Sequence, residues 1–245
     1  MRNIKLTIEY DGRRYAGWQV QGKGAKTIQG ALEKALYEIL HKKLKVIGSG
    51  RTDAGVHAKG QVANFKTDSL IAPDRLRMAL NAVLPADISI LRAEEVSPDF
   101  HSRFSAKSKV YRYTILNRPS RPAILRGMVY FYPYSLDLAL MRREARCLLG
   151  RHDFRSFQAT DKKERGSVRK VKKVAILRDK ELIHIGIEAN GFLYNMIRNI
   201  AGTLIEIGRG KFPEGSIKRI LGLKNRRFAG PNLPAKGLCL LKVNY

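Results

Sequence analysis

The hydrophobic residues of this sequence change period repeatedly, from two residues to about 3.6 residues and back. Residues 3–10 alternate apolar and polar side chains, as in a strand with one buried face. Thr27 can cap a helix over 28–40, where apolar residues recur at helical spacing. Such changes of period predict strands and helices that are mixed along the whole chain.

The same patterns continue to the end of the chain. Further strands are predicted at 61–66, 87–96, 109–117, 173–178, 181–189 and 237–245. Further helices are predicted from Pro73 to Ala82, from a cap at Ser135 to Leu149 with Gly150 as its end, over 192–207, and from Pro213 onward. Residues 155–172 are charged and are predicted to form a loop. The fold class is therefore α+β, with two similar halves, 1–105 and 106–245, that share one continuous and mostly antiparallel sheet.

The charge of the chain indicates a polyanionic partner. Forty-seven Lys and Arg residues against 21 Asp and Glu residues give a net charge of +26. Nucleic acid relieves the resulting repulsion, because each neutralised phosphate releases a counterion. An anionic membrane surface is an alternative partner, and adaptation to heat is an alternative origin of the basic residues. No apolar run is long enough to span a membrane and the first residues lack a signal peptide, so we expect a cytoplasmic location.

Two sequence features argue against metal and nucleotide sites. Cys147 and Cys239 are the only cysteines and lie far apart, which disfavours a zinc finger or a disulfide framework. The segment from Gly17 to Lys23 fits the first seven positions of a phosphate-binding P-loop. Gly24, however, stands where Ser or Thr should hold magnesium. We interpret this segment as a solvated basic loop.

A glycine-rich segment from Gly48 to Ala58 carries the candidate catalytic groups. Its three glycines permit tight turns, and the same segment contains Arg51, Asp53 and His57. Residue types alone leave two interpretations open: Asp53 is a catalytic carboxylate, or it caps a turn beside a screening Arg51. His57 has no metal-ligand partner at a useful spacing, which favours a structural role.

Within this segment, Gly50-Arg-Thr-Asp-Ala-Gly-Val-His-Ala-Lys-Gly-Gln61 resembles the signature loop of the TruA-type tRNA pseudouridine synthases. Further stretches that resemble this family follow in order: Tyr10-Asp-Gly, Gly17-Trp-Gln, Thr27-Ile-Gln-Gly, Asn81 through Ile88, Phe100-His-Ser-Arg-Phe-Ser-Ala106, Tyr111-Arg-Tyr113, His152-Asp-Phe154, Phe192 through Asn199 and Pro234-Ala-Lys-Gly-Leu238. The departures are mild, such as Ile28 where Val is usual. By these matches the chain is identified as a member of the family.

The resemblance implies an enzyme that isomerises uridine to pseudouridine at positions 38, 39 and 40 in the anticodon arm of tRNA. The reaction breaks the N1–C1′ bond, turns the uracil and joins C5 to C1′. Because no net redox change occurs and no group is lost, the family implies no cofactor and no metal. It also implies a homodimer that cradles tRNA, and a shared sheet with helices on one side and a basic cleft on the other.

The resemblance also assigns roles to single residues. Asp53 is the catalytic carboxylate, and the sequence leaves open whether it attacks C1′ or C6 or removes a ribose proton. Arg198 is expected to pair with Asp53 and keep it ionised; a snorkelling or capping Arg is the alternative. Arg51 is assigned to the space that the flipped base leaves. Tyr111 is expected to stack on the target uracil, because an extruded base needs a new π-surface, whereas Tyr113 is a core residue or a neighbour of the site.

Two other functions are alternatives to this enzyme. A non-catalytic RNA-binding protein would have no use for the ionised carboxylate of the Arg51-Thr-Asp53 loop. A metal-dependent nuclease needs clustered carboxylates, which the sequence does not show. Candidate contacts to the RNA arm are the basic stretches Lys162–Arg169, Arg178 and Lys224–Arg227, each of which has a solvated charged face as its alternative.

Overall fold

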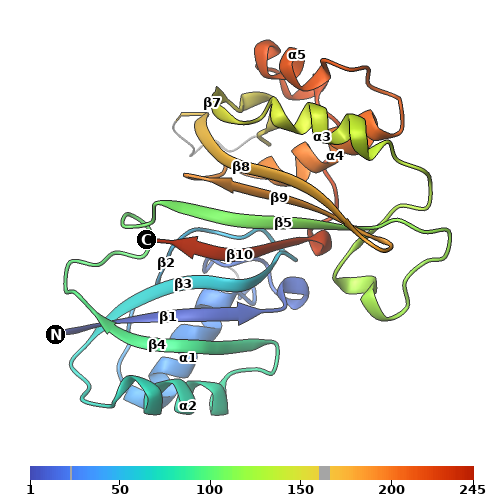
Figure 1. The fold of residues 1–245 in the computed structure, drawn as a ribbon. Coiled ribbons are helices and arrows are strands. Elements are labelled where there is room, and N and C mark those ends of the chain that lie inside the picture. The colour runs from blue at the N-terminus through green and yellow to red at the C-terminus, as the bar shows by residue number, and fades with distance from the viewer. Residues whose placement is uncertain (23, 160–165) are drawn as a thin grey trace. The chain divides into compact units, whose positions relative to one another are not determined.

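A computed structural model describes residues 1–22, 24–159 and 166–245. The chain forms two compact units, residues 1–107 with 240–245, and residues 108–239. Figure 1 follows the chain through both units. Lys23 of the predicted basic loop and residues 162–165 of the predicted basic stretch lie outside the described residues.

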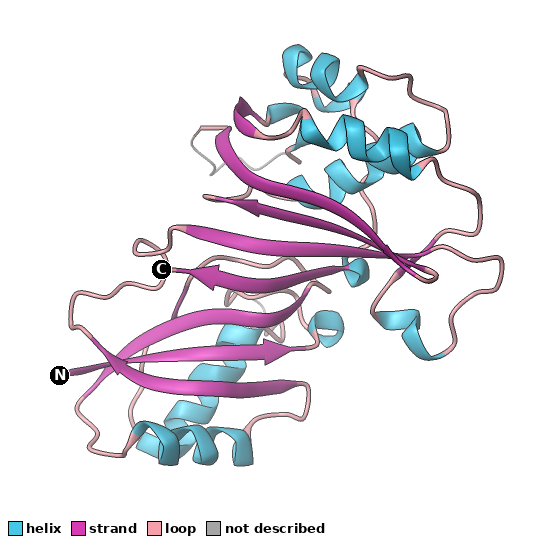
Figure 2. Cartoon of the chain, viewed as in Figure 1, coloured by secondary structure: helices cyan, strands magenta, loops and turns pink. Residues whose placement is uncertain are grey.

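The first unit is a sheet with two helices. Its central strand β1 (Arg2–Tyr10) pairs antiparallel with β3 (His57–Thr67) and with β4 (Ile88–Val96), and the short β2 (Ile47–Gly48) pairs with β3. Helices α1 (Ile28–Leu40) and α2 (Pro73–Val83) lie on one side of this sheet (Figure 2). The last strand of the chain, β10 (Leu238–Asn244), precedes Tyr245, which packs on Phe100.

The second unit has its own antiparallel strands and three helices. In sheet order these strands are β5 (Ser108–Leu116), β9 (Leu182–Ala189), β8 (Val168–Asp179) and β7 (Gly150–Asp153), and β6 (Tyr130–Phe131) pairs parallel with β5. The helices are α3 (Leu138–Arg146), α4 (Met196–Gly208) and α5 (Ser216–Leu223). Every second side chain of β9 is buried, as the alternation in the sequence predicts.

Short 3₁₀ turns connect several of these elements: η1 (Gly12–Arg14), η2 (Ile124–Gly127), η3 (Arg155–Phe157), η4 (Arg226–Phe228) and η5 (Ala235–Gly237). The α+β class and the mostly antiparallel pairing within each unit confirm the prediction from hydrophobic period. The cap at Thr27 is also confirmed, since its hydroxyl accepts a hydrogen bond from the Gly30 N–H at 3.2 Å.

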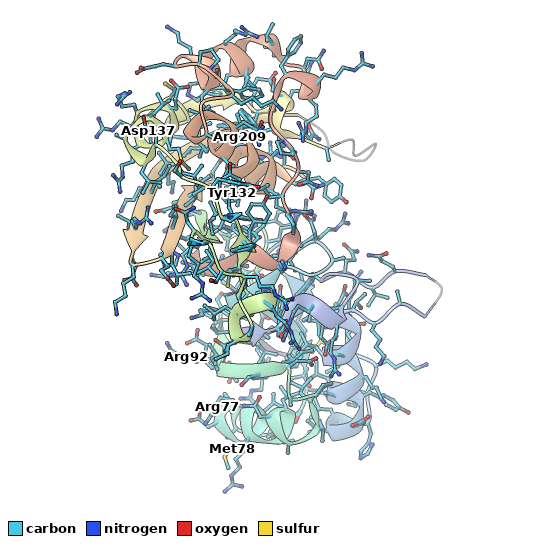
Figure 3. All side chains as sticks on the ribbon, turned by 90° about the vertical axis from the view of Figure 1, so that its right-hand side faces the viewer. Arg77, Met78, Arg92, Tyr132, Asp137 and Arg209 are labelled. Atoms are coloured by element: carbon cyan, nitrogen blue, oxygen red, sulfur yellow. The ribbon has the colours of Figure 1, made fainter. Side chains whose placement is uncertain are left out.

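The helix predicted from Ser135 to Leu149 is wrong at both ends. α3 begins after Asp137, which is labelled in Figure 3 and whose carboxylate accepts a hydrogen bond from the Leu140 N–H at 2.9 Å. Asp137 thus caps the helix in place of Ser135. Gly150 adopts a φ of +99° and starts β7 after the helix has already ended at Arg146.

Other boundaries also differ from the prediction, and the helix predicted from Pro213 begins only at Ser216. The helix predicted over 192–207 begins only at Met196, because Asn195 adopts a left-handed conformation with φ of +60°. The loop predicted over 155–172 is wrong at its end, where β8 begins at Val168. Lys170 and Lys172 flank the buried Val171 there, so the high charge of the segment hides the start of a strand with a buried apolar residue.

Candidate active site

Asp53 lies in the loop that connects β2 to β3, where its side chain is half-buried. Its carbonyl accepts a hydrogen bond from the Val56 N–H at 3.1 Å, which closes a tight turn. Gly55 adopts a φ of +79° in this turn, a conformation that favours glycine. The carboxylate therefore projects from a short, closed turn.

The start of this loop is held by a buried glutamine on β3. The Gln61 side-chain carbonyl accepts a hydrogen bond from the Ser49 hydroxyl at 2.7 Å, and its amide donates to the Gly50 carbonyl at 3.1 Å. Ser49 and Gln61 are both fully buried. Polar groups in such a place must be hydrogen-bonded, and these satisfy one another. The first residues of the loop are therefore fixed to the sheet.

The residue before Asp53 is fixed through both its side chain and its backbone. The Thr52 hydroxyl lies 2.8 Å from the Tyr10 hydroxyl, and the Thr52 carbonyl accepts a hydrogen bond from the Trp18 N–H at 3.0 Å. Gly17, with a φ of +101°, lies so close that a Cβ there would stand 2.6 Å from the same carbonyl. The segment around Gly17 and Trp18 thus packs directly against the loop.

His57 stands at the far end of the loop and is buried. Its Nδ1 accepts a hydrogen bond from the Gly12 N–H at 3.3 Å and lies 3.1 Å from Oδ1 of Asp11. Partial burial acts to raise the pKa of Asp11. Hydrogen bonds from Arg13 and the electrostatic effect of the nearby His57 outweigh burial and lower this pKa below its usual range. The contacts of His57 are those of a structural residue, which is the role that its sequence context favours.

Tyr111 and Tyr113 lie on the same face of β5 in the second unit. The Tyr111 ring is 7 % exposed and meets the ring of Phe192 edge-on, with 5.1 Å between centroids. Tyr113 is fully buried, and its hydroxyl donates a hydrogen bond to the Pro234 carbonyl at 2.8 Å. Burial raises the pKa of Tyr113, while the charge of Arg198 acts in the opposite direction. Tyr113 is thus a core residue that also stands within the field of Arg198.

Arg198 projects from the first turn of α4. Its Nε donates a hydrogen bond to the Leu233 carbonyl at 2.6 Å, and its Nη1 donates to Oδ1 of Asn195 at 2.7 Å. The left-handed conformation of Asn195 starts the helix and presents this amide to the guanidinium. Arg198 and Tyr113 therefore hold consecutive carbonyl groups of the chain, at Leu233 and Pro234.

The four predicted site residues are divided between the units. Asp53 and the exposed Arg51 belong to the loop of the first unit, whereas Tyr111 and Arg198 belong to the second unit. The pairing of Asp53 with Arg198 stays a prediction.

Tyr10, Trp18 and Gln61 have no site role in the prediction from the sequence. Tyr10 and Trp18 each hold the loop that carries Asp53 through one hydrogen bond and Gln61 holds it through two, and all three lie in family-like stretches. The motifs alone could have drawn attention to them, but the bonds depend on strand register. Tyr10, for example, stands opposite Ala58 after an irregularity in the pairing of β1 with β3.

Two features are absent from residues 1–22, 24–159 and 166–245. Over these residues, no group of three or more His, Cys, Asp or Glu side chains is placed to hold a metal ion. Over the same residues, no helix has the length and the apolar character needed to cross a membrane.

The comparisons with known proteins agree with the resemblance seen in the sequence. A family model described as tRNA pseudouridine synthase matches residues 6–105 and 145–245. The chain is 48 % identical over 245 residues to tRNA pseudouridine synthase A of Clostridium acetobutylicum, and 49 % identical over 245 residues to that of Caldicellulosiruptor bescii. Each alignment covers 100 % of both proteins. The chain therefore belongs to the tRNA pseudouridine synthase family.

Proposed function

We propose that this protein isomerises uridine to pseudouridine at positions 38, 39 and 40 in the anticodon arm of tRNA, with Asp53 as the catalytic nucleophile. Membership of the family over the full length of its relatives supports the reaction and the substrate class. The observation that carries the residue assignment is the fixed position of Thr52 and of the turn after Asp53. A carboxylate on such a rigid turn is already oriented before the substrate binds.

The chemistry requires Asp53 to be ionised when it attacks the nucleotide. We assign Arg198 to this task, because a guanidinium close to a carboxylate favours the charged form. A guanidinium has five N–H groups. The bonds to Leu233 and Asn195 use two of them and orient the plane of the group. In this proposal other N–H groups of Arg198 bind the Asp53 carboxylate.

The target uridine must leave the base stack to reach Asp53, which costs a few kcal/mol. Stacking on an aromatic ring recovers roughly 1–3 kcal/mol per base. We assign this role to Tyr111, whose ring is held by Phe192 and keeps a small exposed part. The exposed Arg51 is assigned to the space that the extruded base leaves in the RNA.

Recognition of the RNA arm is assigned to phosphate contacts, in keeping with the net charge of +26. Arg226, one of the candidate contacts, has a structural use instead. It donates hydrogen bonds to Oδ1 of Asn199 at 2.9 Å and to the Ala229 carbonyl at 3.2 Å, and burial lowers its pKa. Lys224 and Arg227 beside it are exposed, and they keep the role of RNA contacts in the proposal. We further propose that two copies of the chain form a homodimer around tRNA.

The test is to map pseudouridine in a bulk tRNA pool that has been treated with the protein. Wild-type protein should add pseudouridine at positions 38, 39 and 40, whereas Asp53→Ala should add none. Modification confined to other positions would contradict the site in tRNA, and modification by Asp53→Ala would contradict the nucleophile. The same mapping in excess chelator addresses the nuclease alternative: intact tRNA and full modification are expected, and chelator-sensitive cleavage would support a nuclease.

A further inference from the structure

One large aromatic side chain of the first unit is held out into solvent. Phe104 is 77 % exposed and lies in the turn that follows β4. A single exposed apolar side chain is common in folded proteins and needs no function. The surroundings of Phe104 are less usual, because neighbouring groups fix the ring in its exposed position.

The imidazole of His101 stacks on the Phe104 ring, with 4.2 Å between centroids and 28° between planes. Nδ1 of His101 accepts hydrogen bonds from the N–H groups of Arg103 at 3.2 Å and of Phe104 at 3.3 Å. The imidazole is thus oriented by the backbone of the residue whose ring it supports. The Arg103 guanidinium lies 5.7 Å from the centroid of the Phe104 ring. Over the described residues, no carboxylate forms a salt bridge with Arg103, which leaves its positive charge available to a phosphate.

The turn itself is fixed to the sheet through Ser102, which is fully buried. The Ser102 N–H donates a hydrogen bond to Oδ1 of Asn64 at 2.9 Å, and its hydroxyl donates to the Ile47 carbonyl at 2.5 Å. The Ser102 carbonyl accepts a hydrogen bond from the Tyr245 hydroxyl at 2.8 Å. With Ser102 held at three atoms, the backbone that leads to Phe104 is fixed to the sheet.

The hydrogen bond from Ser102 to Ile47 connects the turn to the strand before the loop that carries Asp53. Ile47, whose carbonyl accepts the hydrogen bond from the Ser102 hydroxyl, is the first residue of β2. This strand leads into the loop that carries Asp53. Six residues of extended chain span at most about 20 Å. The exposed ring and the proposed nucleophile therefore belong to one compact region of the first unit, within reach of a single folded RNA arm.

We propose that Phe104 and His101 form a stacking platform for an unpaired nucleobase of the tRNA substrate, with Arg103 bound to an adjacent phosphate. This inference rests on the proposed function. Bases stack on aromatic rings whatever their sequence, and a ring that is already fixed loses little freedom on binding. The platform is distinct from Tyr111, which is assigned to the target uracil itself. A second copy of this chain is the alternative occupant of the Phe104 surface.

The first experiment uses fluorescence. The chain has one tryptophan, and Trp18 is only 3 % exposed. Phe104→Trp places an exposed indole on the platform, and Tyr134→Trp places one at a matched aromatic position that is 70 % exposed in the second unit. Titration with tRNA should quench the Phe104→Trp signal strongly and leave the Tyr134→Trp signal nearly unchanged. Equal responses from the two variants, or no quenching of Phe104→Trp when tRNA is bound, would overturn the platform.

The second experiment separates stacking from charge. Phe104→Leu keeps an apolar side chain but has no π-surface, and it should weaken tRNA binding about tenfold without changing the salt dependence. Arg103→Ala should reduce the slope of log affinity against log salt by about one. Unchanged affinity in Phe104→Leu, or loss of its dimer in sedimentation, would overturn the proposal in favour of a bystander ring or a subunit contact. Wild-type protein is assayed for pseudouridine in parallel, so that failure of the proposed function is seen separately.

Discussion

The hydroxyl groups of Tyr10 and Thr52 lie 2.8 Å apart in the interior of the first unit. Tyr10 is the last residue of the central strand β1, and Thr52 immediately precedes Asp53. Both side chains are buried, so the hydrogen bond between the two hydroxyl groups replaces hydrogen bonds to water. The orientation of the proposed nucleophile therefore depends on a side chain that is distant in sequence.

Tyr10→Phe removes this contact and keeps the ring. We expect kcat to fall about tenfold with KM nearly unchanged, because a displacement of about 1 Å at a reacting group costs up to about 10²-fold in rate. The free energy of unfolding should fall by about 1–3 kcal/mol, since the buried Thr52 hydroxyl loses its partner. Single-turnover pseudouridine formation at saturating tRNA measures the first effect, and urea unfolding measures the second.

Thr52→Val provides the control for this prediction. If the two hydroxyls act through each other, Tyr10→Phe in the Thr52→Val background should add little further loss of activity. Losses that simply add would show that Tyr10 acts on the site by another route.

Gly17 is the second position where the loop depends on a distant segment. Gly17→Ala should lower activity by tenfold or more and destabilise the protein, because a Cβ would stand 2.6 Å from the Thr52 carbonyl in a backbone with φ of +101°. Gly24→Ala is the matched control: its φ is +70°, but apart from its chain neighbours no atom of the described residues lies within 4 Å of the added Cβ. It should cost only the left-handed strain of roughly 1–2 kcal/mol and leave kcat near that of wild type. Similar kcat values for the two variants would contradict the packing argument.

Much of the fold was predictable because the spacing of apolar residues along the sequence indicates which side chains of a strand or helix are buried. Thr27 and the strand around Ile183 are examples in which local pattern and tertiary packing agree. The pattern failed at the start of α3, where Asp137 caps the helix two residues after the predicted cap Ser135. It also failed at Asn195, where one left-handed residue delays the start of a helix.

In the candidate site, the residues could be predicted from the sequence but the contacts around them could not. Motif resemblance alone identified Asp53, Arg51, Arg198 and Tyr111. The hydrogen bonds that hold the loop of Asp53 could not be derived from the sequence, because a bond such as that between Tyr10 and Thr52 requires a particular register between strands that are far apart in the chain. The exposed position of Phe104 was equally hidden, since an isolated Phe in a motif suggests burial as readily as exposure.

His184 on β9 should make the stability of the protein depend on pH. Burial and the nearby Arg112 lower the pKa of His184 below its usual value, and Asp179 acts in the opposite direction. An unfolded histidine has a pKa of about 6.5, so just below that pH the unfolded chain binds more protons than the folded protein. Stability from this group is therefore complete above about pH 6.5 and is lost as the pH falls further. Urea unfolding at several pH values should show a shallower acid-side decline in His184→Gln than in wild type, and identical slopes would contradict this prediction.

If the carboxylate of Asp53 performs the chemistry, its charge is essential, and tritium release from tRNA that contains 5-tritiated uridine measures that requirement. Asp53→Asn keeps the size and polarity of the side chain but not its charge. We expect normal folding and tRNA affinity in this variant, with no tritium release above background, whereas wild-type protein releases tritium rapidly. Tritium release by Asp53→Asn at a rate close to that of wild type would contradict this expectation.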